Sequence, residues 1–331
     1  MNIRTRGRYA AVAAAALAAL TACTNSDAGG PAPATSGGTS VTVKGKLGTA
    51  TVKGRPRTVV ALDFTSADIA TQLGFQPVAM SDVPLGPKDG IQPWTEAALH
   101  GDKPALLSTA DGDPVDKVAS YHPDVILATK DYNLTKSYPQ LSAIAPVVHY
   151  TDAPNTDSWQ QTTRTVAKAL GVPGKGEKLI SGAESAIAKA RKDHPAVVGR
   201  KFNFLVSPEP SGVWAVNSTK DVSAQFLSRL GLTLDEPLRK LPTSSIPGRT
   251  RLSYERISDT DTDILFATGS AASLRTLGGQ QGFKALAAVR EHRYLTLDPT
   301  IAQAIAFPSA TSITWAVDKL MPRIDKAAKR G

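Results

Sequence analysis

The 331-residue sequence has a single cysteine, Cys23, and only 6% of its residues are aromatic. One cysteine excludes a disulfide framework, and it excludes zinc or iron–sulfur sites built from several thiolates. With 41% hydrophobic and 20% charged residues, the composition also excludes a wholly disordered chain, a fibre and a polytopic membrane protein. The length allows about two domains.

The sequence also lacks the short motifs of common catalytic sites. It contains no Gly-x-Ser-x-Gly, no Ser-x-x-Lys, no Gly-x-Gly-x-x-Gly and no Walker-type phosphate loop. Its histidines are scattered without a His-x-His or His-x3-His pair, at His100, His122, His149, His194 and His292. His149 follows a predicted strand, and we expect a satisfied or solvent-facing side chain there rather than a metal ligand. The sequence therefore predicts neither an enzyme nor a bare-metal site.

The N-terminal segment is typical of a bacterial export signal. Three arginines precede an uncharged apolar run at 10–20, which is about 16 Å long as a helix and so too short to span the bilayer. The run ends in Leu-Thr-Ala-Cys23, which resembles a lipobox, where cleavage precedes an acylated cysteine. We predict a lipoprotein signal peptide at 1–22 and a lipid on Cys23 that holds the protein at the outer face of the cytoplasmic membrane. An ordinary signal peptide with an incidental cysteine is the alternative.

The residues after the signal read as a tether. Residues 24–41 are mostly Gly, Pro, Ser, Thr and Ala, with Asp27 as the single charged side chain. This composition buries too little surface to fold, so we interpret 23–41 as the acylated cysteine followed by a flexible linker. Without the signal, 35 Lys and Arg face 29 Asp and Glu, a net charge of +6. No long basic run accompanies this surplus, which argues against nucleic-acid binding.

The rest of the chain alternates short apolar runs with amphipathic segments. A hairpin is predicted at 41–53, and buried strands at 58–62, 77–80, 124–129 and 146–149. Helices are predicted between them at 66–73, 114–120 and 135–144, the second of which has Asp113 as its expected cap. Similar segments follow at 201–207, 212–216, 223–230, 263–268 and 293–297, before a closing helix at 309–328. This alternation predicts an α/β fold with mainly parallel sheets.

Two helices interrupt the alternation, at 159–170 and 177–193. Apolar residues fall on one face of the second helix, namely Leu179, Ile180, Ala183, Ile187 and Ala190. This helix is nearly 30 Å long by its residue count. It lies midway between two segments that align without gaps, 116–128 and 255–267. The alignment favours duplicated lobes, with a common helix-to-strand unit met twice by chance as the alternative.

We therefore predict two Rossmann-like α/β lobes, at 42–155 and 196–331, joined by a single long rigid helix within a connector at 156–195. Two such lobes leave a ligand cleft between them at the carboxyl ends of their strands, where open sheets usually bind ligands.

Several stretches match a known family in order and spacing: 57–62, 68–78, 113–128, 159–171, 252–266, 282–289, 293–297 and 307–310. Through them, the chain resembles the iron–siderophore/cobalamin class of substrate-binding proteins of bacterial ABC importers, whose lobes are joined by one rigid helix. The resemblance covers 41–328. Two positions depart from the family: Phe283, where tryptophan is frequent, and Asp116, where a longer acid is usual.

The resemblance implies a monomeric binding module that captures a ferric siderophore and delivers it to a dimeric ABC permease with its ATPase subunits. It implies no cofactor other than the lipid on Cys23. Cobalamin and haem are the alternative ligands. A hydrolase or carrier that uses the same scaffold is the alternative of another class.

The resemblance also implies that the ligand is held through iron-bound oxygens, which suit arginine donors and aromatic faces. Candidates at strand ends and in cleft loops are Phe64, Trp94, Lys130, Tyr132, Trp214, Arg249, Arg251 and Arg275. Arg249 and Arg251 rank highest, in a predicted loop at 247–251, whereas both tryptophans have the alternative of a place in a lobe core. In the family, one acid on each lobe pairs with arginines of the permease, and the matching positions are Asp116 and Glu255. An acid that offsets a helix dipole is the competing explanation for both.

Overall fold

The computed structural model describes residues 40–83, 86–244 and 246–331. The predicted signal peptide at 1–22, the lipid on Cys23 and the tether up to residue 39 lie outside the described residues. Among the described helices, none has both the length and the apolar character that a membrane span requires.

The N-terminal lobe contains a five-stranded parallel sheet of order β5-β4-β3-β6-β7. Its strands are β3 (Val59–Ala61), β4 (Ala79–Ser81), β5 (Ala105–Leu107), β6 (Val125–Ala128) and β7 (Val147–His149). Its helices are α1 (Phe64–Gln72), α2 (Pro93–Glu96), α3 (Val115–Ser120) and α4 (Leu134–Ile144). The predicted hairpin precedes them as β1 (Ser40–Lys44) and β2 (Thr49–Lys53), paired antiparallel. Every residue of β3, β4, β6 and β7 is buried, as expected for parallel strands covered by other layers.

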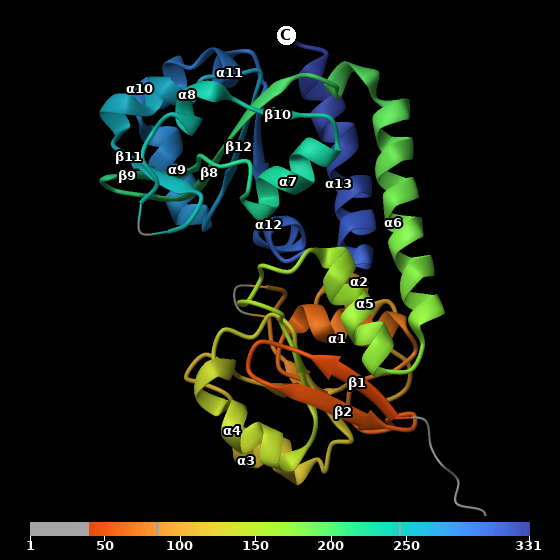
Figure 1. The fold of residues 1–331 in the computed structure, drawn as a ribbon. Helices are drawn as coiled ribbons and strands as arrows, with labels where there is room; N and C mark the ends of the chain where they lie inside the picture. The colour runs from red at the N-terminus through yellow and green to blue at the C-terminus, as the bar shows by residue number, and fades with distance from the viewer. Residues whose placement is uncertain (1–39, 84–85, 245) are drawn as a thin grey trace, which may run out of the picture. The chain divides into compact units, whose positions relative to one another are not determined.

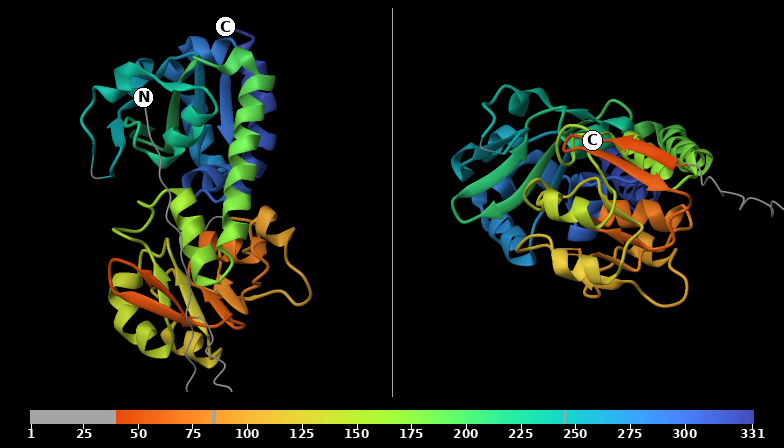
Figure 2. Two further views of the ribbon diagram at one scale, coloured as in Figure 1. Left: turned by 45° about the vertical axis from the view of Figure 1, so that its right-hand side comes forward. Right: turned by 60° about the horizontal axis from the view of Figure 1, so that its bottom comes forward.

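Two helices lead out of this lobe, α5 (Trp159–Ala169) and α6 (Pro173–Asp193). The predicted apolar face of α6 is confirmed, because Ile180, Ala183, Ile187 and Ala190 are all buried. Helix α6 begins earlier than predicted, with Pro173 in its first turn, where a missing N–H costs nothing. Figures 1 and 2 show it running from the N-terminal lobe along the C-terminal one, beside α13 (Ala310–Ala328).

The C-terminal lobe contains a mixed sheet of order β11-β9-β8-β12-β13, with β10 beside the start of β8. Its strands are β8 (Lys201–Glu209), β9 (Gly212–Val216), β10 (Thr233–Leu234), β11 (Arg249–Leu252), β12 (Ile264–Thr268) and β13 (Tyr294–Leu297). Its helices are η1 (Pro195–Val197), α7 (Val222–Arg229), α8 (Glu236–Arg239), η2 (Tyr254–Thr260), α9 (Ala271–Gly279), α10 (Gln281–Ala285), α11 (Ala287–Arg290), α12 (Pro299–Ala306) and α13. Strands β8, β12 and β13 are parallel, whereas β9 is antiparallel to both β8 and β11.

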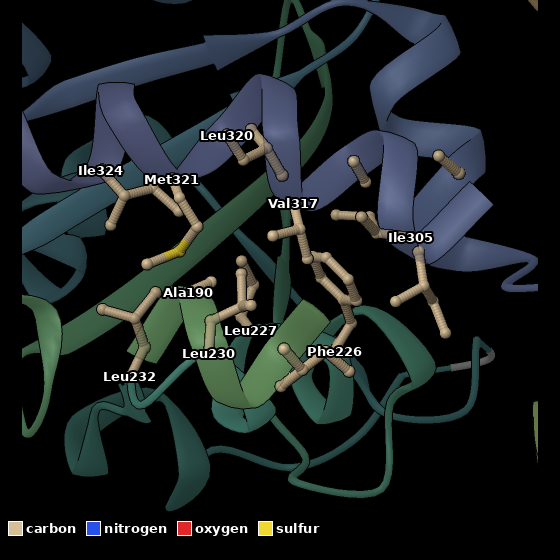
Figure 3. Close-up of a cluster of buried hydrophobic side chains, with 14 of the residues drawn as sticks. Ala190, Phe226, Leu227, Leu230, Leu232, Ile305, Val317, Leu320, Met321 and Ile324 are labelled. Carbon is tan, nitrogen blue, oxygen red and sulfur yellow. The ribbon is translucent and has the colours of Figure 1, made fainter. Parts of the chain in front are cut away.

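The largest apolar core joins α6, α7 and α13. Figure 3 shows Val317 and Leu320 of α13 facing Phe226 and Leu227 of α7, with Ala190 of α6 nearby. Because α13 packs on both α6 and the C-terminal sheet, the connecting helix is part of a core rather than a free rod.

Two local predictions are wrong. Asp113 does not cap α3, since the N-cap position is Pro114 and no side chain caps this helix; the Asp113 carboxylate instead accepts a hydrogen bond from Ser137 Oγ. Arg249 and Arg251 lie on strand β11 rather than in a loop. This strand depends on pairing with the distant β9, which a local pattern does not reveal.

Candidate ligand cleft

A cavity of about 310 Å³ lies at the carboxyl ends of the N-terminal strands. Each central strand contributes to its lining: Leu62 and Asp63 follow β3, Ser81 ends β4, and 130–133 follow β6. Gln303 and Phe307 from the C-terminal lobe complete the lining. A cavity lined by both lobes therefore lies where the cleft was predicted.

Aromatic side chains form the apolar walls of this cavity. Phe64, the first residue of α1, packs edge-on against Phe307 with ring centroids 5.4 Å apart. Tyr132 lines the same cavity and is 63% exposed, so its ring is available to a ligand. Phe64 and Tyr132 thus lie together in the cavity, as expected from sequence, whereas Phe307 belongs to a matched stretch but was not among the candidates.

Asp63 shapes the floor of the cavity. It caps α1, and its carboxylate accepts hydrogen bonds from Ser66 N at 2.7 Å, Ser66 Oγ at 2.7 Å and Lys130 N at 3.0 Å. Burial raises the pKa of Asp63, against the opposing effect of these hydrogen bonds. The carboxylate ties the loop after β3 to the loop after β6, which makes it a positioning residue.

Asp131 is a further acid of the cavity lining. Burial is the main cause that raises its pKa to about 8, and the nearby carboxylate of Asp113 adds to the shift. Its Oδ1 accepts a hydrogen bond from Asn133 N at 2.8 Å, and Asn133 Nδ2 donates to Thr109 O at 2.7 Å. The strand-end positions of Asp63 and Asp131 were the signal that sequence reasoning had available and did not use.

Lys130 is buried and separates two cavities. Its Nζ donates to Asn155 Oδ1 at 2.8 Å, and burial lowers its pKa. On its other side is a smaller cavity of about 120 Å³, lined also by Trp159, Phe226 and Arg229. The Arg229 guanidinium lies 5.9 Å from the centre of the Trp159 ring.

The C-terminal wall begins at Arg249. This residue lines a third cavity of about 130 Å³, together with Phe204, Val206 and Gln303. Gln303 lines the first cavity as well, so these two cavities are neighbours around α12. The Arg249 Nε lies 3.7 Å from Asp221 Oδ2, and Asp221 also caps α7.

Trp214 and Arg251 form a unit on the C-terminal lobe that lines none of the cavities found in the described residues. They are cross-strand partners on β9 and β11, and the guanidinium lies 5.2 Å from the centre of the indole ring. Both contact Glu209, through Arg251 Nη2–Oε2 at 2.7 Å and Trp214 Nε1–Oε1 at 3.3 Å. A Cβ at Gly212 would lie 2.2 Å from Leu252 O, so only glycine permits this close approach of β9 to β11.

Two candidates lie elsewhere. Trp94 is buried in the core beside Trp315, with ring centroids 5.1 Å apart, which is the core alternative foreseen for it. Arg275 is exposed on α9 and lines none of the cavities found in the described residues.

His149 is a satisfied structural histidine. Its Nε2 accepts a hydrogen bond from Leu47 N at 2.9 Å, so Nδ1 carries the proton that is donated to Val147 O. Burial lowers the pKa of His149, which keeps the ring neutral. Over the described residues, no group of three or more His, Cys, Asp or Glu side chains is arranged to hold a metal ion.

Asp116 and Glu255 are both exposed, in the first turns of α3 and η2 respectively. Neither forms an ion pair within the described part of the chain. Two acids on two lobes are thus free to meet an external partner.

A family model described as "Periplasmic binding protein" matches residues 59–300. The chain belongs to the periplasmic binding protein family. As a member of this family, it is a binding protein and not an enzyme.

Solved structures of this family share the fold. A periplasmic solute binding protein from Mycobacterium smegmatis is 28% identical, with a TM-score of 0.77 over 87% of this chain and 99% of that chain. PiaA from Streptococcus pneumoniae, in complex with ferrichrome, is 25% identical, with a TM-score of 0.75 over 88% of this chain and 99% of that chain. These likenesses confirm the predicted fold of two α/β lobes bridged by α6.

Among curated proteins, the Fe(3+)-citrate-binding protein YfmC of Bacillus subtilis is 24% identical over 224 residues. The match covers 67% of this chain and 66% of that relative, just under two thirds of its length.

Proposed function

We propose that this member of the family is an extracytoplasmic lipoprotein that captures a ferric siderophore and delivers it to an ABC importer. The observation that carries the proposal is the pair of neighbouring cavities around α12, to which strand ends of both lobes contribute. The family membership supports it, as do the printed ligands of two relatives, ferrichrome and ferric citrate. We place the lobes at 42–155 and 196–331, the connector at 156–195, and the anchor at Cys23 after a signal peptide at 1–22.

In this proposal, the two lobes hold different parts of the chelate. Phe64, Tyr132 and Phe307 offer aromatic surface from the strand ends and from α12, which suits the apolar body of a siderophore. Arg251 and Trp214 offer a guanidinium stacked on an indole, which suits oxygen acceptors around the metal.

Ligand titration tests the proposal. Tryptophan fluorescence follows the titration, and Trp214→Phe tests whether the partly exposed Trp214 beside Arg251 gives the signal. We expect micromolar or tighter binding of at least one ferric siderophore, which corresponds to ~8 kcal/mol or more. Cobalamin and haemin belong in the same series. Tight binding of either one alone would move the ligand to that alternative, and dissociation constants above ~100 μM for every ligand would contradict the importer role.

We further propose that Asp116 and Glu255 dock onto arginines of a dimeric permease. They are exposed and unpaired, one on each lobe, and a free carboxylate on each lobe matches one bidentate arginine on each of two subunits. Asp116 has the shorter side chain and so the shorter reach.

One assay distinguishes the docking proposal from a local capping role. The double variant Asp116→Lys/Glu255→Lys should abolish ligand-stimulated uptake. Ligand affinity should stay within about threefold, because salt screens exposed charges. Asp102→Lys/Asp318→Lys is the matched control, since it changes two other exposed acids by the same charge. Normal uptake by the first variant would remove the docking role.

The anchor is tested separately. Metabolic labelling with a fatty acid should mark the wild-type protein and not Cys23→Ala, and the variant should leave the membrane fraction. An unlabelled wild-type protein would favour the ordinary signal peptide.

A further inference from the structure

Both arginines of β11 already face an acid, and Arg249 lines the cavity beside α12. Arg251 Nη2 lies 2.7 Å from Glu209 Oε2 and also donates to Ser211 Oγ at 2.8 Å. Arg249 Nε lies 3.7 Å from Asp221 Oδ2, and the Asp221 side chain is 9% exposed. The charge of each guanidinium is therefore balanced before any ligand arrives.

The N-terminal wall has no surplus positive charge either. Its one cation, Lys130, is buried, which lowers its pKa, while the charges of Asp63 and Asp157 favour its charged form. Asp131 adds no positive charge, and burial raises its pKa to about 8. The lining of the main cavity is thus close to neutral, and otherwise consists of aromatic, hydroxyl and amide groups.

Two further arginines do not alter this balance. Arg229 lies over the Trp159 ring in the smaller cavity, on the other side of Lys130. Arg275 is exposed on α9 and lines no described cavity.

A chelate of several negative charges would bind poorly between such walls. It would lose its hydration, and the main cavity would supply no uncompensated cation in return. If it displaced Glu209 from Arg251, it would leave that carboxylate without its partner. A chelate of zero net charge loses far less hydration, and it still accepts hydrogen bonds from the guanidinium N–H groups that the acids leave free.

We propose that the cleft selects an iron(III) chelate of no net charge, of the tris-hydroxamate class, over anionic catecholate and carboxylate chelates. This inference rests on the proposed function, because it names the ligand class of the same site.

Salt dependence and a charge series test the selection in the full chain. We expect ferrichrome, an uncharged hydroxamate, to bind at least ~30-fold tighter than the trianionic ferric enterobactin or ferric citrate. Its affinity should change less than about twofold between about 50 and about 500 mM NaCl, because no net charge is brought to the site. Tighter binding of an anionic chelate would overturn the selection and leave the proposed function standing. Binding of no iron chelate would overturn both.

Removing the acids that pair with Arg251 and Arg249 should shift the ligand preference of the cleft. The double variant Glu209→Gln/Asp221→Asn removes both acids but keeps their shape. Asparagine also retains the cap that Asp221 gives to α7 through Ser223 N and Ala224 N. We expect the affinity ratio of ferrichrome to ferric enterobactin to fall about tenfold or more.

Asp259→Asn is the matched control, because it frees Arg256 from an exposed ion pair of the same lobe without touching a described cavity. Its affinity ratio should equal that of the wild type. An unchanged ratio in the double variant would show that the two ion pairs do not exclude anions, and would overturn the selection.

Discussion

The two lobes share one helix-to-strand unit and use it in the same way. In the N-terminal lobe, Asp124 Oδ2 accepts hydrogen bonds from Arg57 N at 2.7 Å and Thr58 N at 2.9 Å, just before β3. In the C-terminal lobe, the aligned Asp263 accepts from Lys201 N at 2.8 Å, at the start of β8. Each acid precedes a strand that pairs in parallel with the strand it holds, β6 with β3 and β12 with β8. The shared unit therefore sets the centre of each sheet.

The cleft walls built on these similar centres differ. The N-terminal wall consists of loops at strand ends, with buried acids that hold the loops together. The C-terminal lobe adds the antiparallel strands β9 and β11, which carry Trp214 and Arg251 as cross-strand partners. The two lobes thus share the centre of their scaffold, whereas the side chains beside the cavities differ between them.

The largest expected effect concerns the aligned pair Phe266 and Leu127, the bulky residues of β12 and β6. Phe266 is fully buried, with Phe202 and Phe204 edge-on at 6.1 and 6.2 Å. Phe266→Ala should lower the free energy of unfolding by about 4–5 kcal/mol and Leu127→Ala by about 3 kcal/mol. Urea denaturation measures both. Equal losses would mean that the C-terminal core does not depend on its aromatic cluster.

A second prediction concerns the contact between the lobes. Asp68 of α1 is buried and accepts a hydrogen bond from Ser309 Oγ, at the start of α13. Burial raises the pKa of Asp68 to about 7, despite the hydrogen bond from Ser309 and the polar side chains of Gln72 and Thr95, which lower it. Because the folded pKa exceeds the unfolded one, this contribution to stability is full below about pH 4 and lost as the pH rises through about 7.

Asp68→Asn stays neutral, so it should match the wild type near pH 4 and exceed its stability by up to about 4 kcal/mol at pH 8. The difference between the two unfolding curves isolates this residue from other titrating groups. Parallel curves across that range would show that Asp68 does not titrate at the lobe contact. Ser309→Ala is the reciprocal change from the C-terminal lobe, and it should destabilise at all pH values because Ser309 also caps α13.

A third prediction compares Asp124 with Asp263. Asp124→Ala removes two backbone acceptor contacts and Asp263→Ala removes one, so we expect losses of about 2 and about 1 kcal/mol in unfolding free energy. Hydrogen bonds from Thr58 N and Arg57 N lower the pKa of Asp124. Its contribution is therefore present above the unfolded pKa and lost as the pH falls through the lower folded value. The gap between wild type and Asp124→Ala should begin to narrow below about pH 4 and go on narrowing as the pH falls further, and a gap that stays constant there would contradict the charged hydrogen bonds.

The smallest effect concerns the first-turn acids. Asp116→Ala and Glu255→Ala should each lower the melting temperature by about 1–2 °C, since a first-turn acid contributes only ~0.3–1 kcal/mol. Differential scanning calorimetry measures this drop. A loss of more than about 5 °C would indicate that either acid is structural rather than free for a partner.

Much of the fold follows from the sequence because its signals are local. The buried strands, the hairpin and the apolar face of α6 are set by side-chain periodicity and by Asp, Gly and Pro at the boundaries. Strand β11 was not predicted, because its stability comes from pairing with β9, which lies more than thirty residues earlier. The loop reading of Arg249 and Arg251 failed for this reason.

The same distinction between local signals and distant contacts applies to the candidate site residues. Phe64, Lys130, Tyr132 and Arg249 follow or occupy strand ends, and that position alone placed them at the cavities. Trp94 was a candidate as well, but Trp315 of helix α13, from the other end of the chain, covers it. The pairing of Arg251 with Glu209 and of Arg249 with Asp221 was likewise invisible.

The sequence by itself determined the order of helices and strands, the repeated unit and the class of the protein, because these rest on residue patterns within single segments. Only the tertiary structure decided the electrostatics of the cleft. Whether an arginine is free or paired, and whether a carboxyl is charged or protonated, depends on which distant segments meet around it and on how much water they exclude. That is why the neutral character of the walls appears only once both lobes are in place.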